Sequence, residues 1–574
     1  MDCKREFEIW RAALSGNPQW SGELAALEKD DGLLEDSFYK HLEFGTAGMR
    51  GTLGLGTNRM NIYTVRRCTQ GVADCIKAQG KESQGVAIAY DSRRKSDEFA
   101  LETALVLAAN GIKVYLYESI RSVPQLSFTV LNLHCINGIV ITASHNPPEY
   151  NGYKVYGEDG GQLAIEDAAT MTDYINQVED IFSIPLMDKE EAIAKGLLNY
   201  IGEEIDEQYY AKVKALVIDQ SVIDSQADTL KIVYTPLFGT GNRPVRRLLT
   251  DIGIKNLAVV HEQEEPNGDF PGLSAPNPEN REVYGLAFRL AESINANMIM
   301  ATDPDCDRLG VAVKRNDGEW QILTGNQIGC LLMDYILSAK QKDFKGDEFV
   351  VKSLVSTPMA DAIAAHYGVE MRSVLTGFRF IAEQIKLSEQ TGQGTFCFGF
   401  EESYGFLEGT FLRDKDAAMS AMFLAETACS YAARGMTLYD AICQLYAKYG
   451  YYQEKVLSLA LEGIEGIEKI QGAVEKLRQA PPKSFGDFQI LAVADFKTQV
   501  RTDMQTGQTS GTGLPVSDVL YYELENGRLI LRPSGTEPKL KAYVSYYSKE
   551  QAEAEAKLAQ LADIALSTMK ELTK

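Results

Sequence analysis

Histidine is scarce in this chain of 574 residues, which has five, and none of them forms an HExxH pair. A zinc site built from histidine is therefore not expected. The nine cysteines form no CxxC pair and are odd in number, which favours a reduced, cytoplasmic compartment over a disulfide framework. No apolar run approaches the roughly 18 residues of a membrane helix, and charged residues occupy the N-terminal stretch where a signal peptide needs an apolar core. The sequence thus predicts a cytoplasmic protein with no membrane-spanning segment.

Signatures of nucleotide binding and of serine hydrolases are also absent. The chain has no GxxxxGKS/T loop, no GxGxxG after a predicted strand and no GxSxG elbow. No motif therefore indicates a site for a nucleoside triphosphate, a site for a dinucleotide or a hydrolase triad. Acidic residues outnumber basic ones by 80 to 57, which gives a net charge of -23. Such a surface repels polyanions and anionic membranes, so it argues against a nucleic-acid or membrane partner and, taken alone, against an anionic substrate.

A repeated pattern organises most of the chain, whose length suggests about four domains. An apolar strand, a polar loop, an amphipathic helix, a terminating glycine and a second strand occur in this order three times, beginning at Gly85, Leu230 and Glu348. Alternation of this kind predicts parallel strands covered by helices, and hence three related α/β domains. The alternative is that such units recur by chance in any α/β protein.

The C-terminal part of the sequence is different in kind. Residues 452–485 are predicted to form a polar helix and a linker, and the strands and helical tail after them suggest a smaller α+β domain. The predicted domains are residues 1–215, 216–325, 326–455 and 456–574. Ligand sites in such assemblies tend to lie in the clefts between domains.

A serine stands at the end of an apolar strand in the segment IVITASHNPP, residues 139–148. Ser144 is predicted to lie in a rigid, exposed loop. A nucleophilic hydroxyl needs an activating base or a metal, which other segments of the chain must supply. The alternative interpretation is a polar turn that Pro147 terminates.

Three aspartates follow a second apolar strand in the segment DPDCDR. Asp303, Asp305 and Asp307 alternate, so on an extended backbone they point to the same side. Three neighbouring carboxylates repel one another unless a cation neutralises them, and oxygen ligands select Mg²⁺, Ca²⁺ or Mn²⁺. An EF-hand is excluded, because Arg308 and Lys314 stand where that loop needs glycine and glutamate. The alternative is a solvated acidic turn.

Two further loops carry residues suited to a phosphorylated sugar. In RPSGTEPK, a guanidinium, two hydroxyls and a glycine backbone suit a phosphate dianion. In EESYG, Glu401 and Ser403 follow a strand and can bind vicinal hydroxyl groups. An ordinary Ser-Gly turn and a pair of solvated loop acids are the respective alternatives.

Taken together and in this order, TASHNP, DPDCDR, EESYG and RPSGTEPK resemble the α-D-phosphohexomutase superfamily. The resemblance covers nearly the whole chain, from GTAGMRG at 45–51 to the phosphate loop at 532–539. It implies three related mixed α/β sheet domains and a smaller C-terminal α+β domain, TBP-like in fold, around a central cleft. This fold agrees with the repeat found independently.

The resemblance also implies roles for individual residues. Ser144 is similar to the serine that is phosphorylated in the active enzyme, and it would hold Mg²⁺ together with Asp303, Asp305 and Asp307. The residues implied around the reacting phosphate are Arg50, His145, Lys154 and Arg308. Those implied to contact the sugar and its other phosphate are Thr376, Gly377, Glu401, Ser403, Lys415, Arg532, Ser534, Gly535 and Thr536. The sequence does not decide whether Lys154 or His145 is the general base.

The implied activity is an intramolecular phosphotransfer that interconverts glucose 1-phosphate and glucose 6-phosphate through a phosphoserine enzyme, Mg²⁺ and a bound sugar 1,6-bisphosphate. EESYG is similar to the EES loop of phosphoglucomutases, which favours glucose, whereas TGFRFIAE and SFYKHLEFGTAGMRG resemble the subgroup that contains phosphoglucomutase-2 and phosphopentomutase. The alternatives are a phosphopentomutase, a phosphomannomutase, a Mg²⁺-dependent sugar phosphatase and a non-catalytic sugar-phosphate binding protein. Sugar phosphates would be the partners of a monomer or small homo-oligomer.

A cleft of this kind changes the meaning of the net charge. Five cations from distant parts of the chain would converge in it, namely Arg50, Lys154, Arg308, Lys415 and Arg532. The net charge would then describe the outer surface, and a small phosphate would meet a locally positive interior.

Overall fold

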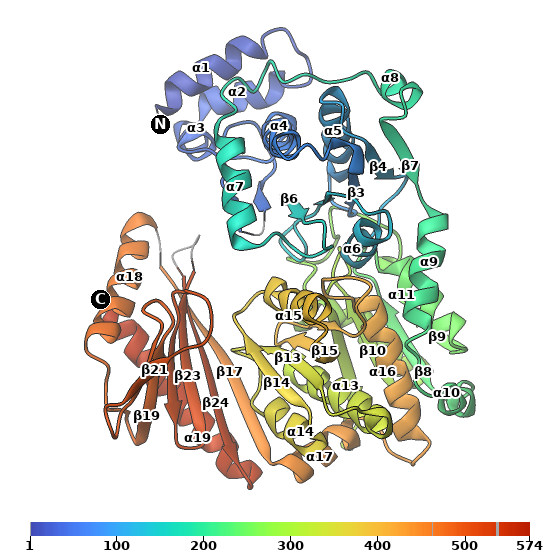
Figure 1. The fold of residues 1–574 in the computed structure, drawn as a ribbon, viewed down its shortest axis with the longest axis vertical. Helices are drawn as coiled ribbons and strands as arrows, with labels where there is room; N and C mark the ends of the chain where they lie inside the picture. The colour runs from blue at the N-terminus through green and yellow to red at the C-terminus, as the bar shows by residue number, and fades with distance from the viewer. Residues whose placement is uncertain (1, 47, 462, 535–538) are drawn as a thin grey trace.

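A computed structural model describes residues 2–46, 48–461, 463–534 and 539–574 of the chain. Strands in these residues form four sheets, each from one continuous part of the sequence, and we call each sheet with its helices a unit. The first unit is uppermost in Figure 1, and the fourth is at the lower left. The expected fold, three mixed α/β units followed by a sheet-and-helix unit, is confirmed.

The first unit contains a mixed sheet with the strand order β1-β2-β6-β5-β3-β4-β7. Its strands are β1 (Phe44–Gly45), β2 (Gly48–Thr52), β3 (Val86–Tyr90), β4 (Val114–Tyr117), β5 (Asn137–Ile141), β6 (Tyr150–Tyr156) and β7 (Leu198–Ile201). Its helices are α1 (Cys3–Ala13), α2 (Ser21–Lys29), α3 (Asp31–Phe38), α4 (Ile62–Ala78), α5 (Ser96–Ala109), α6 (Val123–Asn132), α7 (Ile165–Asn176), α8 (Lys189–Ala194) and α9 (Glu203–Lys214). Trp10 of α1 is buried against the rings of Phe38, Tyr63 and Phe182, at centroid distances of 5.4 to 5.7 Å, so aromatic packing fixes the N-terminal helices.

The second unit has the strand order β12-β11-β10-β8-β9, and the third has β14-β13-β15-β16. The second consists of α10 (Gln220–Gln226), β8 (Lys231–Thr235), α11 (Asn242–Asp251), β9 (Asn256–Val259), α12 (Gly285–Ile294), β10 (Met298–Thr302), β11 (Leu309–Lys314) and β12 (Trp320–Ile322). The third consists of α13 (Gly325–Lys340), β13 (Glu348–Ser353), α14 (Met359–Tyr367), β14 (Glu370–Val374), α15 (Phe378–Thr391), β15 (Thr395–Glu401), β16 (Gly405–Leu407), α16 (Ala417–Ala432) and α17 (Leu438–Tyr449).

The three repeats predicted from the sequence share one plan. Each begins with two parallel strands joined through a helix, as β3-α5-β4, β8-α11-β9 and β13-α14-β14. On the other side of the first strand, a third parallel strand (β5, β10 or β15) runs into a loop and returns as an antiparallel strand (β6, β11 or β16). The loops that contain Ser144, Asp303 and Ser403 therefore occupy the same position in three sheets.

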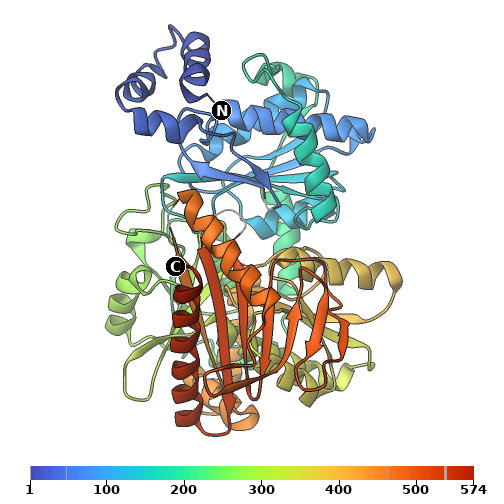
Figure 2. The ribbon, with the colours of Figure 1, turned by 90° about the vertical axis from the view of Figure 1, so that its left-hand side faces the viewer.

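The fourth unit is an antiparallel sheet covered by two helices. Its strands are β17 (Tyr451–Ala460), β18 (Ser484–Phe485), β19 (Phe488–Asp495), β20 (Val500–Asp503), β21 (Thr509–Gly511), β22 (Leu520–Leu524), β23 (Gly527–Pro533) and β24 (Lys539–Ser548). The helices α18 (Gly463–Gln479) and α19 (Gln551–Leu572) lie on the face that Figure 2 turns toward the viewer. The prediction of a polar helix and linker over 452–485 is wrong for its first part, because residues 451–460 pair with β24 along their whole length as an edge strand.

Contacts between the units differ in kind. One buried apolar cluster contains residues of the first three units. The fourth sheet has a core of its own and also shares a smaller buried cluster with Val355 and Leu375 of the third unit. The third unit contacts the first through an ion pair of 2.8 Å between Lys386 and Asp159. The fourth contacts the third through Arg528, which donates hydrogen bonds to the carbonyls of Leu354 and Val355. Within the described ranges, no helix is both long and apolar enough to cross a bilayer.

Candidate active site

Ser144 lies in the loop between β5 and β6, with its backbone in the left-handed region at a φ of 52°, which is uncommon outside glycine. Its N–H donates to Thr142 Oγ at 2.8 Å, and this contact closes the turn. The side-chain hydroxyl donates to Asp303 Oδ2 at 2.7 Å and lies 3.1 Å from His145 Nδ1. The expectation of an exposed loop is wrong: Ser144 is 3% exposed, because the aspartate loop of the second unit packs over it.

Asp91 and Arg93, which follow β3, support the serine loop from behind. The Arg93 guanidinium donates to the carbonyls of Ser144, Asn146, Pro147 and Tyr150. Asp91 lies 3.5 Å from Arg93 Nε and accepts a hydrogen bond of 2.6 Å from Thr142 Oγ. Sequence reasoning missed both residues, although their segment DSRRKS follows the first strand of the first repeat.

The three aspartates after β10 form a buried cluster whose ligand atoms all lie within 4.8 Å of one another. Asp303 Oδ1 accepts the N–H groups of Asp307 and Arg308, at 3.1 and 3.0 Å, which curls the loop around this carboxylate. Oδ1 of Asp305 and Oδ1 of Asp307 are buried and have no hydrogen-bond partner within the described part of the chain. Buried carboxylate oxygens without a donor are costly, and a bound cation would remove that cost.

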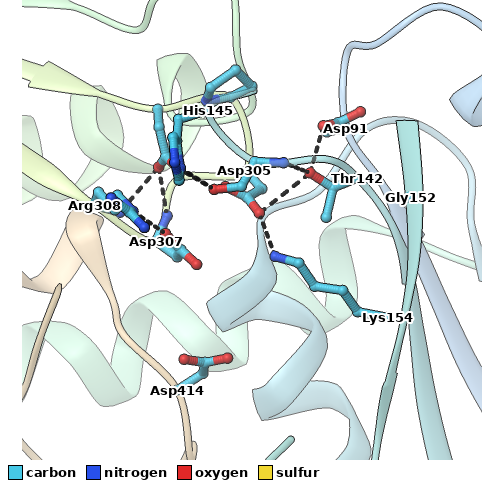
Figure 3. A network of polar contacts seen from close by, with 12 residues as sticks. Asp91, Thr142, His145, Gly152, Lys154, Asp305, Asp307, Arg308 and Asp414 are labelled. Atoms are coloured by element: carbon cyan, nitrogen blue, oxygen red, sulfur yellow. Dashed lines mark hydrogen bonds and ion pairs between the residues drawn. The ribbon is translucent and has the colours of Figure 1, made fainter. Parts of the chain in front are cut away.

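Two lysines outside the cluster offset part of its negative charge. Lys154 Nζ, on β6, lies 2.9 Å from Asp305 Oδ2, and Lys415 Nζ lies 3.0 Å from Asp307 Oδ2. Figure 3 shows Lys154 pointing from the first unit toward Asp305, beside Thr142. Burial, and then the charges of Asp305 and Asp307, raises the pKa of Asp303 well above its ordinary value. Burial opposes ionisation of Asp305 too, but the Lys154 ammonium lowers its pKa. The two lysines contact the Oδ2 atoms, so neither Oδ1 atom accepts a hydrogen bond from the described residues, although Arg308 Nε lies 3.8 Å from Asp307 Oδ1.

Arg50, His145 and Arg308, three of the residues predicted to surround the reacting phosphate, lie at or near the serine loop. Arg308 pairs with Glu279 at 2.7 Å and is 3.8 Å from Asp307. Arg50, on β2, donates to Asn146 Oδ1 at 2.9 Å. Burial, followed by the charge of Arg308, lowers the pKa of His145 well below its ordinary value, so its imidazole is neutral at physiological pH.

The segment EESYG closes the hairpin between β15 and β16. Glu401 is 6% exposed and accepts a hydrogen bond of 2.7 Å from the N–H of Gly377. Burial raises the pKa of Glu401 to about 7, against the opposing effect of the Lys415 ammonium. Glu402 accepts a hydrogen bond of 2.8 Å from the Ser353 hydroxyl instead. The two adjacent glutamates therefore have different environments.

A cleft of about 740 Å³ lies between the four units. The predicted site residues that line it are His145, Arg308, Thr376, Gly377, Glu401, Ser403 and Arg532. Lys154 and Lys415 lie behind its wall, in contact with the aspartates. The backbone N–H of Ser534 donates to the carbonyl of Lys539 at 2.8 Å. Gly535 and Thr536 lie outside the described residues.

The charge of the cleft is opposite to that of the molecule. Its cationic lining residues are Arg308, Arg379, Arg532, Lys539 and Lys541, and its acidic ones are Glu279, Glu401 and Glu402. Sequence reasoning gave no site role to Glu279, Arg379, Lys539 or Lys541. The argument against an anionic substrate from net charge alone is thus wrong, because the acidic excess lies outside the cleft.

The fold and the site together define a four-unit α/β phosphoryl-transfer enzyme of the phosphohexomutase class. The chain belongs to the phosphoglucomutase/phosphomannomutase family. Models of that family's alpha/beta/alpha domains I, II and III match residues 41–181, 207–318 and 324–449, and the model of its C-terminal domain matches residues 465–561.

Curated relatives cover most of the chain. The phosphoglucomutase of Staphylococcus saprophyticus is 37% identical over 504 residues, which are 88% of this chain and 90% of the relative. The phosphoglucomutase of Staphylococcus aureus strain USA300 is 36% identical over 515 residues, 89% of this chain and 90% of the relative.

Solved structures show the same fold at low sequence identity. Parafusin (phosphoglucomutase) from Paramecium, in an open form, has a TM-score of 0.68 at 15% identity and covers 93% of this chain and 95% of its own. A phosphoglucomutase/phosphomannomutase family protein from Burkholderia thailandensis has a TM-score of 0.66 at 20% identity, with 92% and 97% covered.

Proposed function

We propose that the protein is a phosphoglucomutase that interconverts glucose 1-phosphate and glucose 6-phosphate. The observation that carries the proposal is the 2.7 Å contact between Ser144 Oγ and Asp303 Oδ2. It joins a nucleophile of the first unit to a carboxylate cluster of the second, beside a cleft that the other two units complete. The name of the staphylococcal relatives supports glucose as the sugar.

Mg²⁺ would be held by Asp303, Asp305, Asp307 and an oxygen of Ser144. The Oδ1 atoms of Asp305 and Asp307, which accept no hydrogen bond from the described residues, suit a hard cation that takes oxygen ligands. Bound there, Mg²⁺ offsets negative charge on the transferring phosphoryl group. Lys154 then keeps the Asp305 carboxylate ionised and oriented.

In the forward step, the bond from phosphorus to Ser144 Oγ breaks while a bond forms from phosphorus to a sugar hydroxyl oxygen. The hydroxyl proton must leave, and His145 is the acceptor that we favour over Lys154. His145 lines the cleft, whereas Lys154 lies behind its wall with Nζ held 2.9 Å from Asp305. Arg308 lies at the cleft surface, where its guanidinium offsets charge on the phosphoryl oxygens.

The sugar would be held across the cleft from Ser144. Glu401, Ser403, Thr376 and Gly377 would provide groups for its hydroxyls. Lys415, whose Nζ lies 3.0 Å from Asp307 Oδ2, would line the sugar side. The non-transferred phosphate would bind Arg532 and Ser534, together with Gly535 and Thr536. A sugar 1,6-bisphosphate intermediate then turns end for end, so that its other phosphate returns to Ser144.

Several finer points stay predictions. Sugar bisphosphate would serve as both intermediate and activator, and sugar phosphates would be the only partners of the cleft. A monomer or small homo-oligomer in the cytoplasm is expected.

The proposal is tested by phosphorus NMR with glucose, mannose, glucosamine, ribose and deoxyribose 1-phosphates, Mg²⁺ and a trace of sugar bisphosphate. Glucose 1-phosphate should give glucose 6-phosphate fastest, and Ser144→Ala should abolish turnover without loss of folding. Ser225→Ala, at an exposed serine, is the matched control and should be fully active. Faster turnover of a pentose phosphate would show that a pentose, and not glucose, is the preferred sugar. Net phosphate release would indicate a phosphatase. An active Ser144→Ala variant would refute the mechanism.

A further inference from the structure

Arg379 of the third unit reaches two separate backbone segments of the first unit. It is the second residue of α15, is half-buried and lines the cleft. Its Nη1 donates to the carbonyl of Leu163 at 3.1 Å, and its Nη2 donates to the carbonyl of Thr46 at 2.5 Å. One guanidinium therefore ties the start of α15 to the segment before α7 and to the turn between β1 and β2.

The turn that Arg379 holds belongs to the hairpin that carries Arg50. β1 and β2 pair at Gly45 and Gly48, so Thr46 lies in a very short connection. Arg50 follows on β2 and donates to Asn146 Oδ1 of the serine loop at 2.9 Å. A displacement of Thr46 would thus be transmitted through the paired residues of β1 and β2 to the group that contacts the serine loop.

At its other end, Arg379 adjoins the residues proposed to bind the sugar. Gly377, two positions before it, donates its N–H to Glu401 Oε1 at 2.7 Å. The same short segment therefore contacts the sugar-binding glutamate through its backbone and the Arg50 hairpin through the Arg379 side chain. Arginine carries five N–H donors in one planar group, which can serve two carbonyls at once, whereas lysine has a single nitrogen.

We propose that Arg379 is a positioning residue that fixes the Arg50 hairpin against the sugar-binding segment, so that the sugar hydroxyl and the phosphoryl group on Ser144 meet in line. The proposal rests on the proposed function, since it assigns Arg379 a part in that same phosphoryl transfer. Small displacements of reacting groups reduce rates strongly while leaving substrate affinity nearly unchanged.

Helix α15 also contains a matched control, a residue that connects the same two units but lies away from the Arg50 hairpin. Lys386 lies on the same helix and makes a 2.8 Å ion pair with Asp159, also in the first unit, with side-chain exposures of 44% and 32%. Lys386→Ala removes a contact between the same two units without touching the hairpin of β1 and β2. A half-exposed pair of this kind contributes little to stability.

The experiment compares Arg379→Ala, Arg379→Lys and Lys386→Ala with the wild-type protein. Arg379→Ala should lower kcat by about tenfold or more with KM changed by less than about threefold, and Arg379→Lys should restore only part of this loss. Lys386→Ala should stay within about twofold of wild type. In an Arg50→Lys background, Arg379→Ala should lower kcat by less than about threefold, because the two residues act in one chain of contacts.

Hydrogen exchange gives a readout that does not depend on turnover. Backbone amides of residues 48–52 should exchange faster in Arg379→Ala than in Lys386→Ala. The proposal would be overturned by equal amide exchange rates in the two variants or by a rise in KM with no change in kcat. It would also be overturned if the kcat losses of Arg379→Ala and Arg50→Lys multiplied fully in the double variant. Absence of mutase turnover in the wild-type protein would instead refute the proposed function, so the two failures are distinguishable.

Discussion

Arg93 donates hydrogen bonds to four backbone carbonyls of the serine loop, and its side chain and that of Asp91 are both fully buried. A backbone carbonyl without a donor is costly inside a protein. The positive φ of Ser144 persists because Arg93 holds the loop from behind while Thr142 caps it from within. At the scale of the residue, the reactive geometry of Ser144 is therefore set by a side chain that does not face the cleft.

Arg93→Lys should lower the free energy of unfolding by about 3 kcal/mol, because one ammonium cannot replace a guanidinium that serves four buried carbonyls. Chemical denaturation measures this loss, and turnover of the folded fraction should fall as well. Arg94→Lys is the control, since Arg94 pairs with Asp269 at side-chain exposures of 52% and 67%, and its effect should stay below about 0.5 kcal/mol. Equal losses in the two variants would contradict the role of Arg93.

At the scale of the element, helix α6 links the first unit to the aspartate loop of the second. Ser122 and Gln125 form a capping box at its N-terminus, so the first turn is well fixed. The N–H of Val123, in that first turn, donates to the carbonyl of Asp305 at 2.9 Å. The start of α6 thus holds the backbone of a proposed metal ligand.

Ser122→Ala should cost about 1 kcal/mol of stability through loss of the cap. It should also shrink the rise in Tm that Mg²⁺ produces, since the aspartate loop loses a rigid support. Thr437→Ala removes the equivalent capping box of α17, so it should cost a similar amount but leave the Mg²⁺ response unchanged. Differential scanning fluorimetry with and without Mg²⁺ measures both effects, and identical Mg²⁺ responses would refute the link.

Elements with strong local patterns were predictable from the sequence, and elements that depend on distant partners were not. The repeats from Gly85, Leu230 and Glu348 could be found because each helix ends at a glycine between apolar strands. β17 was missed because its polar residues belong to an edge strand whose partner, β24, is far along the chain. Arg93 and Arg379 were missed because both bind backbone carbonyls, which have no signature in the sequence.

At the scale of the whole molecule, a buried apolar cluster and the hydrogen bonds of Arg528 position the fourth unit against the third. Arg528 of β23 is 6% exposed and donates to carbonyls that follow β13 of the third unit. Arg532, proposed to bind the second phosphate, lies four residues further along the same strand. Since a paired strand is stiff, the Arg528 contact helps to fix the place of Arg532 relative to the third unit.

Arg528→Ala should raise KM for glucose 1-phosphate by about tenfold, because the fourth unit would occupy its binding position for a smaller fraction of the time. Small-angle X-ray scattering should show a larger mean radius of gyration. Arg501→Ala is the control, because Arg501 pairs with Glu523 at 2.7 Å within the fourth unit itself. Unchanged KM and scattering in Arg528→Ala would show that other contacts position the unit.

The division of the chain at residues 215, 325 and 455 stays a prediction, although the four sheets themselves are each formed by one continuous part of the sequence.

The common position of the three functional loops has a consequence for redesign. Each loop joins a central strand to its antiparallel neighbour in a sheet of its own, as 142–149, 303–308 and 402–404. Under the proposed roles, phosphoryl chemistry and part of the sugar contact would reside in hairpin tips of separate sheets. Grafting another tip at 402–404 would then exchange Ser403 of the proposed sugar site while the nucleophile and its carboxylates keep their own scaffolds.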